Sequence, residues 1–127
     1  MDRFESGTQQ LDKMKGKNKD LIFSNLKDVS PDLVRLTIEF AYGDVLARPG
    51  LDLKSRQVAT VAALTALGNA PLELNAHINM ALNVGCSREE IVEIITHMAV
   101  YARFPAALNG MAVAKDVFAE RDRNGTG

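Results

Sequence analysis

The stretch PLELNAHINMALNVGCSREEIVEIITHMAVY, residues 71–101, decides the fold class. Helix signals dominate it, and the alternation typical of strands is nearly absent. Pro71 stands at a first helical position, and Gly85 follows the last turn of that helix as a left-handed residue. Ser87 and Glu90 then match a capping box, in which each side chain accepts a backbone N–H at the start of the next helix.

The same signals extend outward in both directions. Ser30 and Pro31 predict the start of a helix that ends near Ala47 and carries apolar side chains at 33, 36 and 40. Pro105 opens the last long helix, and Gly16 with Asn18 ends the first. We therefore expect an all-α fold of six or seven helices in a single domain, residues 1–127, with helices over 2–14, 21–26, 31–47, 53–67, 71–84, 87–101 and 106–120.

The charge and composition of the chain argue against several classes of function. Fifteen basic and sixteen acidic residues give a net charge of −1, which argues against a nucleic-acid partner, because such proteins carry a basic face. The N-terminus lacks the apolar segment of a signal peptide, and no stretch approaches the roughly 20 apolar residues that span a membrane. One cysteine, Cys86, cannot form an internal disulfide, so we expect a cytoplasmic protein.

Glu73 and His77 are the first candidates for chemistry. They lie four residues apart on one predicted helix, so their side chains share a face. A carboxylate beside an imidazole raises its pKa and orients it, as in an acid/base pair. The alternative is an ordinary ion pair on a helix surface.

Each of the other candidate residues also has an explanation in which it serves the structure alone. His97 lies among apolar residues and fits a core histidine, and the two histidines without a third ligand do not indicate a metal. Cys86 is near a helix N-terminus, which lowers a thiol pKa, but it has no partner cysteine and reads as structural. Arg56 and Arg103 are candidates for binding a substrate carboxylate, although most arginines are surface residues.

Three blocks together resemble the carboxymuconolactone decarboxylase family. They are LDLKSRQVATVAALTALG, ELNAHINMALNVGCSREEI and HMAVYARFPAALNGMAVAKDVF, and SPDLVRLTIEFAYGDV upstream also looks like this family. The likeness covers nearly the whole chain, from Phe4 to Phe118. It implies a compact all-α subunit, with the alkylhydroperoxidase D-like fold, that assembles into homo-oligomers, commonly hexamers.

The resemblance also separates two kinds of chemistry. The alkylhydroperoxidase D branch uses a pair of cysteines a few residues before the histidine that matches His77. The corresponding positions here fall near Ala70 and Glu73, so thiol chemistry lacks its residues. The decarboxylase branch converts 4-carboxymuconolactone to an enol-lactone and CO2 with no cofactor.

The decarboxylase branch implies roles for particular residues. His77 becomes the general acid, Glu73 its orienting partner, His97 a second donor, and Arg56 a carboxylate anchor. The chain departs from the family's usual pattern at Gln57, where glutamate is common, and at Arg103, where glycine is common.

The sequence supports three hypotheses for function. The leading one is a cofactor-free decarboxylase of a small carboxylated lactone, with Gln57 and Arg103 also placed at the substrate. The others are a redox protein like the alkylhydroperoxidases and an oligomeric ligand-binding protein without enzymatic activity.

Overall fold

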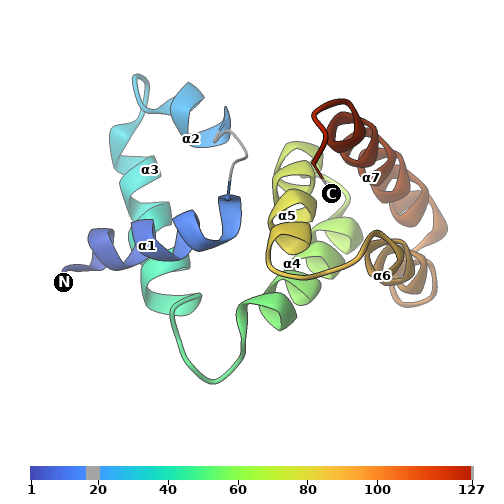
Figure 1. Ribbon diagram of the computed structural model, residues 1–127, viewed down its shortest axis with the longest axis horizontal. Helices are drawn as coiled ribbons and strands as arrows, with labels where there is room; N and C mark the ends of the chain where they lie inside the picture. The colour runs from blue at the N-terminus through green and yellow to red at the C-terminus, as the bar shows by residue number, and fades with distance from the viewer. Residues whose placement is uncertain (17–20, 127) are drawn as a thin grey trace. The chain divides into compact units, whose positions relative to one another are not determined.

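The chain is all-helical over residues 1–16 and 21–126, the residues described by the computed structural model (Figure 1). The predicted all-α class is confirmed, with no strand in these residues. Within the described residues, seven α-helices and one π-helical segment follow in order: α1 (Arg3–Lys15), α2 (Leu21–Leu26), α3 (Pro31–Leu36), η1 (Thr37–Val45), α4 (Leu53–Leu67), α5 (Pro71–Asn83), α6 (Arg88–Tyr101) and α7 (Phe104–Arg123).

Most predicted helix ends are confirmed. Ser87 Oγ accepts from Glu90 N at 3.0 Å, and a Glu90 carboxylate oxygen accepts from Ser87 N at 2.9 Å, so the capping box is formed. Gly85 has a φ of +115°, as a residue after a helix end requires. Gly16 ends α1, while Asn18 lies outside the described residues. The last helix is longer than predicted, because α7 continues to Arg123.

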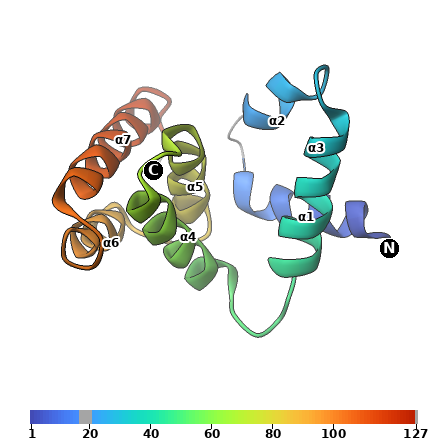
Figure 2. The same ribbon diagram turned by 180° about the vertical axis from the view of Figure 1, so that it is seen from behind.

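The contacts of the chain divide it into two compact units, Met1–Leu53 and Lys54–Gly127. Figures 1 and 2 show the helices of each unit from opposite sides. The single domain predicted from the length of the chain stays a prediction, and each unit is described by itself below.

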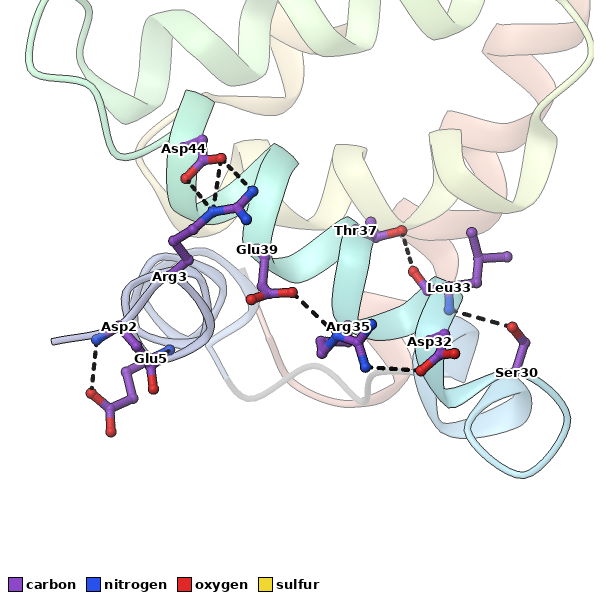
Figure 3. Close-up of polar contacts among 10 residues, drawn as sticks. All are labelled: Asp2, Arg3, Glu5, Ser30, Asp32, Leu33, Arg35, Thr37, Glu39 and Asp44. Atoms are coloured by element: carbon purple, nitrogen blue, oxygen red, sulfur yellow. Dashed lines mark hydrogen bonds and ion pairs between the residues drawn. The ribbon is translucent and has the colours of Figure 1, made fainter.

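In the first unit, α1 crosses η1 at very close range. A Cβ on Gly7 would overlap the backbone carbonyl oxygen of Ile38, and one on Gly43 would lie 2.6 Å from the backbone oxygen of Arg3. Glycine at both positions therefore lets the two backbones touch. Figure 3 shows that Arg3 also reaches Asp44, with Nη2 donating to Oδ2 at 2.6 Å.

The helix predicted over residues 31–47 of this unit differs from the structure. Its start is confirmed, because Ser30 Oγ accepts from Leu33 N at 3.3 Å. After Leu36 the helix widens into a π-helix, at the point where the Thr37 hydroxyl donates to the Leu33 carbonyl at 2.9 Å (Figure 3). Such a hydroxyl bond competes with the backbone ladder.

The face that this helix buries is also different from the one that its apolar spacing predicts. Three large apolar side chains at that spacing, Leu33, Leu36 and Phe40, are more than half exposed. The core of the unit instead takes the side chains from the other face, Val34, Ile38 and Tyr42.

The second unit has one apolar core, to which four helices contribute. The buried side chains are Val61 from α4, Leu74, Ile78 and Ala81 from α5, Ile91 and Ile95 from α6, Ala107, Ala114 and Val117 from α7, and Cys86 from the turn before α6. Two close-packed residues bring α7 near α4, since a Cβ on Gly110 would lie 2.9 Å from Thr65 Cγ2. Because α4 and α5 both contribute to this core, a side chain of α4 can reach His77.

Candidate active site

The buried stripe of α4 carries polar side chains. Gln57, Val61 and Thr65 are spaced four residues apart and are at most 1% exposed. Thr65 satisfies its hydroxyl within the helix, donating to the Val61 carbonyl at 2.7 Å. Gln57, at the start of the stripe, extends its side chain toward α5. A fully buried amide needs hydrogen-bond partners, and this one finds a partner on α5.

That partner is His77. Its Nδ1 lies 3.0 Å from Gln57 Oε1. The imidazole is partly buried, between Leu74 and Ile78 in the sequence of α5, both of which are in the core. Burial lowers the pKa of His77 from 6.5 to about 4, because removing the ring from water disfavours its charged form. His77 is therefore a neutral imidazole at neutral pH, held by a neutral amide.

The predicted pairing of Glu73 with His77 is not what the structure contains. Neither a hydrogen bond nor an ion pair joins the two side chains in the part of the chain that is described. The expectation that a carboxylate raises the pKa of His77 is wrong in this structure, since desolvation lowers it instead. Spacing of four residues places two side chains on one face, but Gln57 from the neighbouring helix occupies Nδ1.

His97 lies on α6 with its side chain exposed rather than in the core. Its ring stacks on Tyr101, with 4.9 Å between the ring centroids and an angle of 35° between the planes. Tyr101 is 76% exposed, so this pair forms part of the surface. No described contact joins His97 to His77, and a shared role for the two histidines stays a prediction.

The two candidate arginines occupy different places. Arg56 is partly buried on α4, next to Gln57 in the sequence, and its carbonyl accepts from the Thr60 hydroxyl at 2.9 Å. Arg103 is exposed at the N-cap of α7, and its guanidinium lies over Gly68, where an added Cβ would be 2.7 Å from Nη2. Because Gly68 follows the last residue of α4, Arg103 stands at the negative end of that helix dipole.

A small hollow of about 30 Å³ lies beside Gly68, the glycine over which the Arg103 guanidinium lies. It is about the size of one water molecule. None of the six predicted site residues lines it; its walls are Leu64, Thr65, Gly68, Ala70, Pro71, Leu74, Ala106, Asn109, Gly110 and Val113.

One buried charged residue, Arg121 on α7, was not predicted from the sequence. It is only 5% exposed and donates from Nη1 to Asn79 Oδ1 at 3.0 Å and to Asn83 Oδ1 at 3.3 Å. A signal for it was present, because Arg121 continues the buried spacing of Ala114 and Val117. The guanidinium ties α7 to α5, the helix that carries the candidate histidine.

Cys86 is buried in the core of the second unit. Burial raises the pKa of its thiol, and nearby Glu90 adds to that effect. The thiol is therefore protonated at neutral pH, which is the opposite of what a reactive cysteine needs.

Two other classes of site are absent from residues 1–16 and 21–126. No cluster of three or more potential metal ligands occurs there. None of the helices in those ranges has the length and apolar character needed to cross a membrane.

Comparison with known proteins now decides the family. A sequence model of the carboxymuconolactone decarboxylase family matches residues 31–116, a range that includes Gln57, His77 and both candidate arginines. The chain belongs to this family. It is also 34% identical over 117 residues to 4-carboxymuconolactone decarboxylase from Acinetobacter baylyi, covering 91% of this chain and 87% of the relative.

Two further relatives are more distant in coverage. Nitrosuccinic acid decarboxylase from Metarhizium robertsii is 39% identical over 80 residues, which are 63% of this chain and 55% of that protein. An uncharacterized 15.0 kDa protein of Paracoccus denitrificans is 31% identical over 98 residues, covering 76% and 73% of the two chains. The family model and two of the three relatives, those from Acinetobacter baylyi and Metarhizium robertsii, carry the name of a decarboxylase.

Proposed function

We propose that this protein is a carboxy-lyase that removes CO2 from a small carboxylated compound such as 4-carboxymuconolactone. The observation that carries the proposal is the 34% identity with a decarboxylase of that name over 91% of the chain. The second named decarboxylase supports the reaction class, although its substrate differs.

The two named substrates share a chemical logic. In each, CO2 leaves a carbon whose electrons can be taken up by a neighbouring group, a lactone in one compound and a nitro group in the other. Both names describe acids with two carboxyl groups, so one carboxylate remains after the reaction. A site for either compound needs a cation for the remaining carboxylate and a group that delivers a proton to carbon.

In this chain, His77 is the group that we assign to proton delivery. The C–C bond to the carboxylate breaks, CO2 leaves, and the electron pair stays on the substrate. A proton then passes from a ring nitrogen of His77 to carbon, and the neutral imidazole takes up another from solvent. A bound dianion raises the pKa of a nearby imidazole, so the substrate itself favours the protonated form that donates.

We propose supporting roles for the remaining predicted residues. Arg56 and Arg103 supply cations for substrate carboxylates, since a guanidinium binds a carboxylate through two hydrogen bonds. Glu73 and His97 are proposed as further polar groups at the substrate, contributed by the same chain or by a neighbouring copy.

We also propose that copies of the chain assemble, as a hexamer, in the cytoplasm. Large apolar side chains gather at the end of α6 and the start of α7, where Val100, Tyr101, Phe104 and Leu108 are each more than two-thirds exposed. Large apolar side chains that are exposed close together in the sequence support an interface with another copy of the chain. Neither a nucleic acid nor a membrane is proposed as a partner, and no cofactor is needed for the reaction.

The test is CO2 release from 4-carboxymuconolactone and from nitrosuccinate by the purified protein, measured separately. We expect turnover of at least one compound, and a loss of about 10²-fold or more in kcat for His77→Gln, the contribution typical of a general acid. Cys86→Ser is the matched control and should keep full activity. Absence of CO2 release from both compounds, or unchanged turnover in His77→Gln, would contradict the proposal.

A redox function has no supporting observation in the described residues. It would require Cys86, which is buried with a raised thiol pKa, and the Cys86→Ser control tests it directly.

A further inference from the structure

The hydrogen bond between Gln57 and His77 joins two neighbouring helices. Gln57 is 0% exposed and lies at the start of the buried stripe of α4. Its Oε1 meets Nδ1 of His77 at 3.0 Å, across a separation of twenty residues in the sequence. A side chain with no surface open to solvent cannot itself meet a substrate, so its effect on chemistry passes through the imidazole.

The chemistry of the amide oxygen determines where the proton of His77 lies. A carbonyl oxygen accepts hydrogen bonds and donates none. Nδ1 must therefore carry the N–H, and in a neutral ring Nε2 then holds the lone pair. The other tautomer would bring two lone pairs together in a buried place.

We infer that Gln57 is a positioning residue that keeps the proton of His77 on Nδ1 and so leaves Nε2 as the nitrogen that exchanges a proton with the substrate. This inference rests on the proposed function, because Nε2 acts only if the protein decarboxylates a substrate. In the cycle, Nε2 takes a proton from solvent, the substrate carboxylate leaves as CO2, and the N–H bond breaks as the new C–H bond forms. The ring returns to the neutral form with its proton on Nδ1.

The neutral amide also differs in effect from a glutamate placed at the same position. A carboxylate in the same place would form an ion pair with the imidazolium and favour its charged form. An amide sets the same orientation without adding charge. An orienting partner can hold the imidazole ring in place and can also favour its charged form. Gln57 does only the first, so the protonation of the ring depends on the substrate.

Few charged side chains on these helices could control the protonation of His77 in place of Gln57. Lys54 and Arg56 lie on α4, Glu73 lies on α5, and Arg121 of α7 reaches α5. Lys54 pairs with Glu90 at 3.3 Å, and Arg121 is bonded to asparagines of α5. Burial is the cause of the lowered pKa of His77, and no charge among the described residues contributes to it.

The chain has only two histidines, so the ring can be observed without ambiguity. In the His97→Gln variant, His77 is the single imidazole, and long-range ¹H–¹⁵N spectra report which nitrogen is protonated. We expect the proton on Nδ1 across the neutral range. A spectrum with the lone pair on Nδ1 would overturn the inference whether or not the protein has decarboxylase activity.

Substitutions at Gln57 then test the link to the reaction. Gln57→Glu should raise the midpoint of the His77 titration by about 1–3 pH units and move the acidic limb of the kcat/KM profile by the same amount. Gln57→Met, of similar volume, should give a mixture of tautomers and lower kcat more than it changes KM. Should the buried glutamate prevent folding, the methionine variant and the spectrum of His97→Gln still decide the matter.

The outcomes separate this inference from the proposed function. Unchanged tautomer and kcat in Gln57→Met would overturn the positioning role, even in an active enzyme. A protein that releases no CO2 from either test compound contradicts the proposed function, and the predicted tautomer then stands or falls on the spectrum alone.

Discussion

The burial of His77 makes a prediction about acid stability. The folded protein holds this ring with a pKa of about 4, against 6.5 for an unperturbed histidine. As the pH falls below 6.5, the unfolded chain binds a proton at this position before the folded protein does. Stability is therefore complete above pH 6.5, is lost as the pH falls toward 4, and shows no further loss from His77 below that value.

The size of the effect follows from the two pKa values. Each pKa unit corresponds to about 1.4 kcal/mol, so the complete difference is about 3 kcal/mol. Between pH 7 and pH 5 the free energy of unfolding should fall by about 2 kcal/mol through His77 alone. This is a large part of the stability of a small protein, which is typically about 5–15 kcal/mol.

Urea unfolding of the protein and of His77→Gln, at a series of pH values between 7 and 4, measures this contribution. The difference between the two proteins should shrink by about 2 kcal/mol from pH 7 to pH 5, because only the original chain loses stability through this ring. All samples need one protein concentration, since self-association shifts midpoints. His97→Gln, which removes an exposed imidazole, should keep the acid sensitivity. A pH-independent difference between the original chain and His77→Gln would refute the burial argument.

Three further predictions concern packing, and circular dichroism during urea unfolding checks them. Gly7→Ala should destabilise the first unit by roughly 3 kcal/mol or more, because the added methyl meets a backbone carbonyl that cannot move aside. Gly110→Ala should cost less, about 1–2 kcal/mol, since Thr65 side-chain atoms 2.9–3.3 Å away can shift by a few tenths of an ångström. Gly50→Ala meets nothing within 4 Å and serves as the control for both; equal effects at all three positions would contradict this order. Arg121→Ala should cost about 2–4 kcal/mol through lost hydrogen bonds and lost burial of the side chain, and an unchanged midpoint would show that the guanidinium does not tie α7 to α5.

The local signals of the sequence were enough for most of the helices. Pro71, Gly85 and the Ser87–Glu90 box act within one or two turns, so their effects can be read without knowledge of distant residues. The same holds for the order of residues that identified the family, which the match over residues 31–116 bears out. The apolar spacing at 33, 36 and 40 failed because both faces of that helix carry apolar residues, and only tertiary packing selects the face of Val34 and Ile38.

At the candidate site, the contributions of the sequence and of the tertiary structure can also be told apart. The sequence alone determined that the protein is helical, that it belongs to a decarboxylase family, and that His77 is one of only two histidines available for proton transfer. Only the tertiary structure decided the partner of His77. Glu73 shares its helix, but hydrogen bonding depends on which helix packs alongside, and the core places α4 there with Gln57 at 3.0 Å. Desolvation is likewise a property of the packed core, which is why the pKa of His77 falls when the sequence predicted a rise.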